Sequence, residues 1–303
     1  MPAPQALTAD AIAVSASSPS PRRFRSPRSD VIWPIAFLIP YAAVFLAFVV
    51  YPVVYGLSLA SDPSLYAELL SDPLYARTVV NTLLFVAIGV NVKMFLALLV
   101  SGFFMSRRWW VRALLLVYML PWALPAVPAF VSFHWMLIGE YGFVDSLLSA
   151  LFDVDGPIWF NERWLALGAD IVSYIWKWMP FWTLVFLAGR RAIPREIYEA
   201  ADVDGATGSR RFVHVVCPLL ANLYLVCTLL STLWTIGDFT TVFLVSMGAP
   251  ARSTEVLATL GVHYAFDTAR PSLGIAAVLS ALPVLIPIAV TLMRRLETRE
   301  VQL

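Results

Sequence analysis

Charged residues are scarce in this sequence. Of its 303 residues only 14% are Asp, Glu, Lys or Arg, whereas 60% are hydrophobic and the mean hydropathy is +0.77. Soluble domains carry a much larger share of charge, so the composition excludes a soluble protein. It indicates a polytopic membrane protein, in which each helical span needs roughly 20 apolar residues to cross the hydrocarbon core.

The sequence also has few residues that could carry chemistry. It contains two cysteines, Cys217 and Cys227, which we expect to pack rather than form a disulfide, and three scattered histidines without metal-ligand spacing. Phosphate-loop, nucleophile-elbow, zinc-protease and dinucleotide motifs are absent from the sequence. We therefore expect no catalytic residue, no metal and no cofactor in this chain, and no nucleic-acid partner.

What the sequence does contain is six long apolar stretches. Each is long enough to cross a bilayer as a helix. The predicted fold is therefore all-α, a polytopic membrane bundle of six transmembrane helices. The predicted spans run from Trp33 to Tyr55, Val79 to Met105, Val111 to Ile138, Trp164 to Ala188, Val213 to Val245 and Leu273 to Met293.

The arginines are distributed unequally between the two sides of these spans. With the N-terminus inside, fifteen arginines are cytoplasmic and only four lie on the other face, which holds many acidic residues instead. Arg and Lys in short loops stay cytoplasmic, so both termini are predicted to lie inside. The cytoplasmic arginines are Arg22, Arg23, Arg25, Arg28, Arg107, Arg108, Arg112, Arg190, Arg191, Arg195, Arg210, Arg211, Arg294, Arg295 and Arg299.

The two ends of the chain differ from the apolar middle. Residues 1–30 are rich in Ala, Ser and Pro and hold too few apolar residues to pack, so we expect a disordered cytoplasmic tail. The first apolar stretch is longer than the core of a secretory signal, and we expect it to be retained as a span. The membrane domain then covers residues 31–296, and residues 297–303 form a short cytoplasmic tail.

One polar segment, residues 193–220, stands between two apolar stretches on the predicted cytoplasmic side. Pro194 suits the first turn of a short helix, and the good helix formers that follow it continue that helix. Gly205 permits a turn. A second helix that starts near Thr207 or Ser209 would run into the next span. The segment therefore predicts a helical hairpin in the cytoplasm.

The first helix of this hairpin has the residues of a docking helix. Ile197 and Tyr198 are apolar anchors, Glu199 offers a charge to a partner's Arg or Lys, and Ala200 and Ala201 allow another backbone to approach closely. That combination suits a helix laid into a groove of another protein. The alternative is a self-contained helix on the membrane surface.

The spacing of residues in the hairpin resembles a known loop. Glu199-Ala200-Ala201 is followed after two residues by Asp204-Gly205-Ala206. Five residues then separate this triplet from Phe212, and five more separate Phe212 from Pro218. This pattern is similar to the EAA loop of permease subunits in binding-protein-dependent ABC importers, of the maltose and glycerol-phosphate type with the MetI-like fold. The chain departs from the family at Cys217 and lacks the second proline after Pro218.

The resemblance extends over about residues 31–296. Other motifs that carry it are Pro40, Tyr51-Pro52, Leu120-Pro121-Trp122, Ile175-Trp176, Pro180-Phe181, Leu187-Ala188-Gly189 and Ile193-Pro194. It implies that residues 193–212 form the coupling loop held by an ATPase. The residues implied to couple to that ATPase are Ile197, Tyr198, Glu199, Ala200, Ala201, Asp204 and Gly205.

The resemblance also implies partners and a location. The chain would be one permease of a pair, and it would sit on a dimer of ABC ATPases that bind ATP and Mg²⁺. A periplasmic or lipid-anchored solute-binding protein would deliver a carbohydrate. The complex would lie in the cytoplasmic (inner) membrane of a bacterium, and the chain itself would not be an enzyme.

Two apolar stretches carry polar and aromatic stripes at helical spacing, which need a lumen or a protein partner. Aromatic faces stack on the C–H side of a sugar ring, and polar groups bind its hydroxyls. We predict a carbohydrate pocket, on the two helices that the resemblance also favours. Its residues are Tyr174, Lys177, Trp178, Phe181, Ser231, Trp234, Thr235 and Asp238.

The alternative is that Lys177 and Asp238 pair with one another or with helix ends, while the aromatic residues face lipid or the core. Asn91 and Lys93 lie well inside the second span, and for Asp170, near the start of the fourth, we expect snorkelling to the interface. Prolines at 121–128 should kink the third span.

Other solutes and other classes of protein stay open at this point. The solute could be a polyol, a glycerol phosphate or an acidic sugar. A secondary transporter would normally show inverted repeats, and none is convincing in this sequence. A membrane receptor or assembly factor would have six spans and a docking loop without a pocket.

Overall fold

The structure, a computed structural model, describes residues 29–300, and the chain divides into two units, residues 1–54 and 55–303. The predicted disordered tail therefore lies outside the described residues except at its end, where α1 (Ser29–Phe45) begins. A π-helical turn (Leu46–Val50) joins α1 to α2 (Tyr51–Leu59). No described residue from Phe37 to Leu59 is buried within the chain, as expected of a helix in contact with lipid or another subunit.

The described part of the second unit consists of helices and their connecting segments, without a strand. Helix α17 continues to Glu300, past the predicted start of the C-terminal tail, and residues 301–303 lie outside the description. The α-helices of the second unit after α2 are α3 (Pro63–Ser71), α4 (Pro73–Phe103), α5 (Trp109–Tyr118), α6 (Leu120–Ala123), α7 (Ala126–Met136), α8 (Phe143–Phe152), α9 (Arg163–Ala192), α10 (Arg195–Val203), α11 (Gly208–Arg211), α12 (Cys217–Leu219), α13 (Ala221–Ile236), α14 (Thr240–Leu244), α15 (Leu257–Val262), α16 (Pro271–Leu279) and α17 (Leu282–Glu300).

The described helices account for the predicted spans. Four are long and apolar enough to cross a membrane, at Phe37–Leu59, Pro73–Phe103, Arg163–Ala192 and Pro271–Arg295. Two further pairs of helices pass the same test but are bent, and counting each pair as one span gives six. The predicted all-α membrane bundle is confirmed.

The two bent spans correct the predicted boundaries. Residues 109–136 turn by 92° between α6 and α7, at the prolines expected to kink this span. The predicted span Val213–Val245 is wrong as a single helix: the stretch 208–219 and α13 meet at 71°, and α13 ends at Ile236. Leu220 and Gly237, at the two ends of α13, both have ψ near zero, which ends a regular helix.

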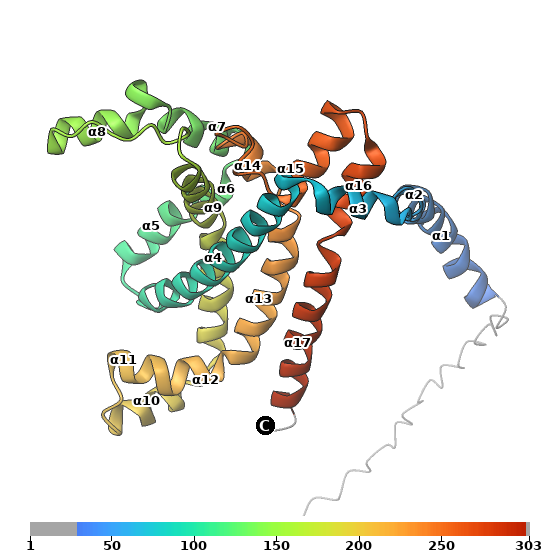
Figure 1. Cartoon of the computed structure of the whole chain (residues 1–303). Helices are drawn as coiled ribbons and strands as arrows, with labels where there is room; N and C mark the ends of the chain where they lie inside the picture. The colour runs from blue at the N-terminus through green and yellow to red at the C-terminus, as the bar shows by residue number, and fades with distance from the viewer. Residues whose placement is uncertain (1–28, 301–303) are drawn as a thin grey trace, which may run out of the picture. The chain divides into compact units, whose positions relative to one another are not determined.

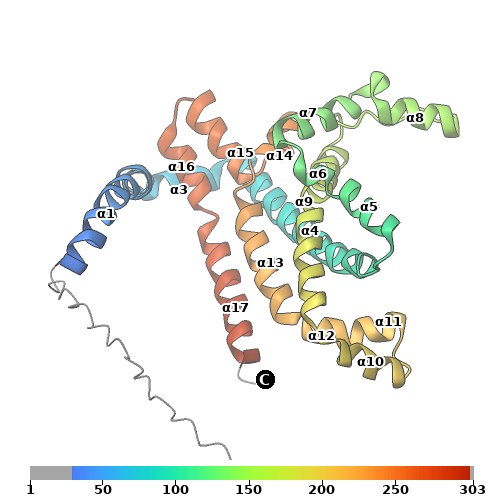
Figure 2. The same ribbon diagram turned by 180° about the vertical axis from the view of Figure 1, so that it is seen from behind.

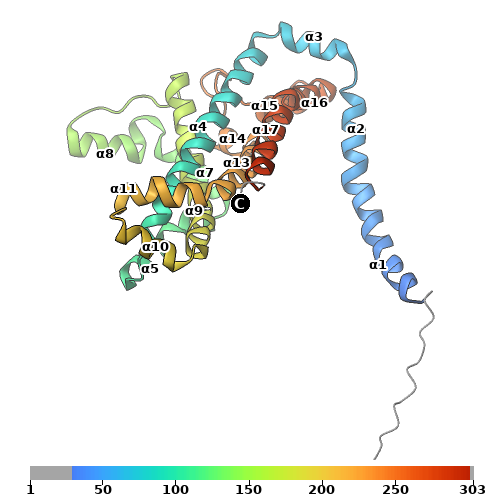
Figure 3. The same cartoon turned by 90° about the horizontal axis from the view of Figure 1, so that it is seen from below.

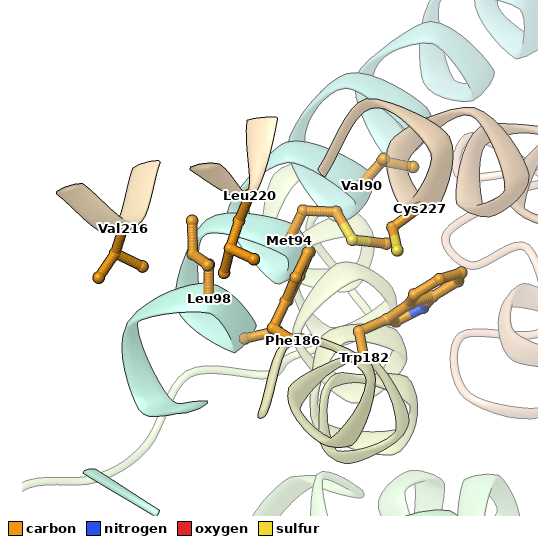
Figure 4. Packing of buried hydrophobic residues seen from close by; sticks show 9 residues of the cluster. Val90, Met94, Leu98, Trp182, Phe186, Val216, Leu220 and Cys227 are labelled. Atoms are coloured by element: carbon orange, nitrogen blue, oxygen red, sulfur yellow. The ribbon is translucent and has the colours of Figure 1, made fainter. Parts of the chain in front are cut away.

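The core lies where α4, α9 and α13 pack together (Figure 1). Figure 4 shows side chains from these helices and from the segment before α13 meeting in one cluster. Its members are Val90, Met94, Ala97, Leu98, Trp182, Phe186, Val216, Leu220 and Cys227. Cys227 is buried there and Cys217 packs against the cluster, both as free thiols, so the predicted packing role is confirmed.

Polar side chains of α4 hold the segment that follows α14. Asn81 Nδ2 donates to the carbonyls of Ser253 (2.8 Å) and Glu255 (2.9 Å), and Asn81 Oδ1 accepts from Arg163 Nη2 (2.7 Å). The backbone N–H of Leu257 donates to Thr82 Oγ1 (2.9 Å). A buried non-helical segment needs such partners, because unpaired backbone groups are costly away from water.

The polar hairpin lies at one end of the second unit. Figures 1 and 2 place α10 and α11 at the end where α17 finishes, and α3, α8 and α16 at the opposite end. Figure 3, a view from the hairpin side, shows α10 and α11 in front of the bundle. The hairpin and the end of α17 therefore share a side, as the arginine distribution predicts.

The closest approach between α15 and α16 is at two glycines. A Cβ added to Gly274 would lie 2.4 Å from the carbonyl oxygen of Gly261, and backbone cannot move aside as a side chain can. We predict that Gly274→Ala lowers the free energy of unfolding by about 1–3 kcal/mol, measured by thermal unfolding in detergent. Gly168→Ala in α9 is the matched control, since nothing lies within 4 Å of its added Cβ. Equal melting temperatures for the two variants would contradict the prediction.

Candidate functional site

The polar hairpin forms as the sequence predicts. Pro194 precedes the first residue of α10, and α10 ends where Gly205 adopts a φ of +70°, a left-handed conformation that glycine adopts at little cost. The N–H of Ala206 donates to the carbonyl of Ala201 (2.8 Å), which closes the turn. Thr207 then precedes α11. A short helix, a glycine turn and a second helix therefore follow in the expected order.

The predicted coupling residues divide between the two faces of α10. Ile197, Glu199 and Ala200 are exposed, and so are Asp204 and Gly205 at the end of the helix. These five are the exposed members of the predicted coupling set. They form the surface that a partner could reach, which we call the outer face of the hairpin.

Tyr198 and Ala201 belong to the opposite face. Tyr198 is half-buried against the core cluster, so it is not a freely exposed anchor for a partner. Ala201, expected to let a partner's backbone approach closely, is buried within the chain. The Tyr198 hydroxyl donates to the carbonyl of Arg190 (3.1 Å), and burial raises the pKa of this tyrosine. Asp202 and Arg211 form an ion pair at 2.8 Å that ties α10 to α11. The Tyr198 hydrogen bond attaches the hairpin to α9, and the ion pair holds the two helices of the hairpin together.

Arg190, near the end of α9, connects the hairpin to α4. Its buried guanidinium donates from Nε to Ser101 Oγ and from Nη2 to the carbonyl of Leu98, both at 2.8 Å. It also lies 5.5 Å from the centre of the Phe212 ring. A cation near the C-terminal end of a helix is favourable, because the helix dipole is negative there. In the sequence, Arg190 served only as evidence for the orientation of the chain. Its position directly before the hairpin could have indicated that it holds the end of α9 in place.

Three residues of the predicted pocket lie in the protein interior between α9, α13 and α4. The hydroxyl of Tyr174 contacts Thr235 Oγ1 at 2.6 Å and accepts a hydrogen bond from Lys93 Nζ at 2.9 Å. Ser231, one turn before Thr235, is fully buried. The predicted stripes on the two helices do face one another, and Lys93 of α4 joins them. The sequence left the role of Lys93 open because its partners are on other helices.

Lys177 and Asp238 contact the ends of helices, the arrangement that the sequence analysis gave as an alternative. Lys177 Nζ donates to the carbonyls of Pro121 (2.7 Å), Trp122 (3.3 Å) and Leu124 (2.5 Å), at the break between α6 and α7. Asp238 Oδ1 accepts from the N–H of Thr241 (2.9 Å) at the start of α14. The two side chains therefore satisfy the ends of helices rather than each other.

The remaining aromatic residues of the stripes form an accessible surface. Trp234 of α13 is 56% exposed and its ring centre lies 6.2 Å from that of Phe181 on α9. Phe181 in turn stacks on Trp122 of α6 at 5.7 Å, and Trp122 is 41% exposed. We call Trp122, Phe181 and Trp234 the aromatic surface. Trp178 is half-buried, and its Nε1 lacks a hydrogen-bond partner among the described residues.

The expectation that Asp170 snorkels to the membrane interface is wrong. Its side chain is fully buried, and Oδ1 accepts from the N–H of Ser246 at 3.1 Å. Asn91 behaves differently, because it is exposed and its side chain donates back to the carbonyl of Ala87. Within the described residues, no group of three His, Cys, Asp or Glu side chains is placed to hold a metal ion.

Comparisons with known proteins place this geometry in a family. Residues 93–301 match the family model described as binding-protein-dependent transport system inner membrane component. The chain is 35% identical over 246 residues to the sulfoquinovosyl glycerol transport system permease protein SmoG of Agrobacterium fabrum, covering 76% of this chain and 79% of that protein. It is 28% identical to the trehalose/maltose transport system permease protein MalF of Thermococcus litoralis, covering 75% and 81%.

A solved structure supports the fold. The chain resembles one from a bacterial ABC transporter involved in the import of the acidic polysaccharide alginate, with a TM-score of 0.76, 21% identity, and coverage of 89% of this chain and 96% of that chain. At that identity the likeness concerns the fold alone. Together, the helical bundle, the hairpin at one end and the match over residues 93–301 show that this multi-pass membrane protein belongs to the permease family of binding-protein-dependent ABC transporters.

Proposed function

We propose that this chain is one of two permease subunits of an ATP-driven importer, and that its hairpin docks on a separate ATPase. The observation that carries the proposal is the hairpin itself, with Ile197, Glu199 and Ala200 exposed on its outer face and Arg190 and Tyr198 fixing its inner face to the bundle. ATP and Mg²⁺ would bind to the ATPase dimer, so this chain hydrolyses nothing. Closure of that dimer would move the hairpin and, through it, the spans.

The same proposal sets the orientation in the cytoplasmic membrane. The hairpin and the end of α17 lie on one side of the second unit, where arginines are concentrated in the sequence. Cytoplasmic loops carry an excess of Lys and Arg. Both termini and the hairpin are therefore cytoplasmic, and the opposite end, with α3 and α8, receives solute from an extracytoplasmic binding protein.

The proposed solute is a sugar or a sugar derivative. The relatives support this class by name, since they include permeases for sulfoquinovosyl glycerol, for trehalose and maltose, and for diacetylchitobiose in Streptomyces coelicolor. The aromatic surface supports it chemically, because indole and phenyl faces pack on the C–H side of a sugar ring.

Uptake into vesicles tests the proposed function. The full complex, with both permeases, the ATPase and the loaded binding protein, is reconstituted with ATP inside or outside the vesicle, and labelled sugars, a polyol and glycerol phosphate are compared. Sugar uptake that needs ATP at the hairpin side supports the proposal. Uptake driven by an ion gradient without ATP would instead identify a secondary transporter, and preference for glycerol phosphate or the polyol would reassign the solute.

The turn at Gly205 gives a prediction about coupling. Gly205→Pro cannot adopt the φ of +70°, because the proline ring holds φ near −65°. We expect ATP-driven uptake to fall by about tenfold or more, given a cost of about 3 kcal/mol at the turn. Gly205→Asn is the matched control and should retain most of the uptake, because Asn tolerates positive φ. Normal ATP-driven uptake by Gly205→Pro would exclude the hairpin as the element that transmits ATPase closure to the spans.

Glu199 gives a separate prediction about docking. Glu199→Arg breaks the exposed ion pair with Arg195 (2.7 Å) and replaces one of the two negative charges of the outer face by a positive charge. An exposed pair contributes about 0–1 kcal/mol, so the chain should remain folded while capture of the ATPase is lost. Pull-down of the ATPase measures this, and unchanged capture would contradict a docking role for the outer face.

Lys177 and Trp234 separate a structural role from a solute-binding role. Lys177→Met removes the donor for three carbonyl groups, so we expect the free energy of unfolding to fall by about 1–3 kcal/mol. Trp234→Ala should change the melting temperature less but reduce sugar uptake by about three- to tenfold, since it removes an exposed aromatic face. Thermal unfolding and uptake are measured on both. A Lys177→Met variant that stays as stable as the wild type but loses uptake would contradict the structural role and support a solute-binding role for Lys177.

A further inference from the structure

A cavity of about 730 Å³ lies between the turn that joins α4 to α5 and the junction of α9 with α10. Its lining includes five arginines and no Asp or Glu. They come from three places in the chain: Arg107 and Arg112 from the turn and the first part of α5, Arg190 and Arg191 from the end of α9, and Arg195 from the start of α10. The fold therefore gathers positive charge around one cavity.

Three of these arginines have no counter-ion among the described residues. Arg190 is engaged with Ser101 and Leu98, and Arg195 is paired with Glu199. Arg107, Arg112 and Arg191 are exposed, and no hydrogen bond, ion pair or ring contact engages their side chains in the described part of the chain. Three converging cations with free donors form a site for an anion with several acceptor oxygens, such as a phosphate.

The residues beside the cavity place it at the boundary between lipid and water. Trp109, directly after the α4–α5 turn, is 80% exposed, and Trp110 is exposed next to it. Further along α5, Leu116 and Val117 are apolar and exposed, as expected of a face in contact with lipid tails. Tryptophans are enriched where membrane meets water, at the depth of the phospholipid headgroups. The free arginines therefore lie at the depth where phosphate groups of lipids are found.

We propose that this cavity binds the phosphate group of an anionic phospholipid, held by Arg107, Arg112 and Arg191. Basic pockets on the cytoplasmic side of membrane proteins bind lipid headgroups in this way. Tyr198 of α10 also lines the cavity, so a bound headgroup would contact the inner face of the hairpin. The lipid would thereby stabilise the attachment of the hairpin to α4 and α5, in addition to the contacts of Arg190.

The test is lipid retention by the purified permease pair in nanodiscs made from phosphatidylethanolamine with a minor fraction of phosphatidylglycerol, followed by native mass spectrometry. The variant replaces Arg107, Arg112 and Arg191 by Gln. We expect the amount of retained phosphatidylglycerol to fall by about tenfold or more. The control replaces three other arginines that lie outside the cavity lining, Arg77, Arg210 and Arg294, by Gln and should retain the lipid.

Two further arms identify the ligand. Replacing the same three cavity arginines by Lys keeps the charge and should preserve most of the retention, which shows that the folded site persists. Millimolar inorganic phosphate should leave the lipid bound. Equal retention by the cavity variant and the wild type, equal loss in the control, or displacement by inorganic phosphate would overturn the proposal. So would retention that falls when purified ATPase is added, because the arginines would then serve the protein partner.

Discussion

Backbone carbonyl and N–H groups that are freed inside a membrane must find partners within the protein, and this requirement shapes the whole bundle. Two of the spans are bent, by 92° and 71°, and the segment after α14 is not helical. Two of these three irregularities, the 92° bend and the segment after α14, are matched by buried polar side chains on the long helices α9 and α4. Lys177 of α9 donates to the carbonyls at the α6–α7 break, and Asn81 of α4 donates to those before α15. The long helices α4 and α9 therefore supply donors as well as apolar packing.

The same requirement explains how far the sequence could be used. Six apolar stretches, a helical hairpin and its glycine turn follow from composition and local preference, and the structure confirms them. The spacing also placed Tyr174 and Thr235 each in a stripe on one face of its own helix, since helical periodicity fixes which residues share a face, and the structure brings these two residues into contact. Local rules were sufficient wherever the partner of a residue lies on the same helix or its sequence neighbour.

Helical periodicity and local preference could not predict the partner of a side chain that binds backbone groups far away in the sequence. The carbonyls that Lys177 binds lie more than fifty residues earlier in the chain, and the N–H that Asp170 accepts from belongs to Ser246. Nothing in the sequence around Lys177 distinguishes a lysine that faces a solute from one that satisfies a broken helix. The prolines on either side of Leu124 were the available signal, because a break in a span predicts that the freed carbonyl groups need donors from elsewhere in the chain.

The orientation of Lys177 has a consequence for how such a transporter could evolve. The ammonium group of Lys177 is bound by backbone carbonyls. The three side chains of the aromatic surface, Trp122, Phe181 and Trp234, are themselves uncharged. Aromatic faces rank solutes by shape and by the C–H groups they present, with little regard to the sign of a substituent elsewhere on the ring. Under the proposed function, in which this surface binds the solute, a lineage that moved from neutral to acidic sugars would need a new delivery protein first, while the permease could be inherited almost unaltered.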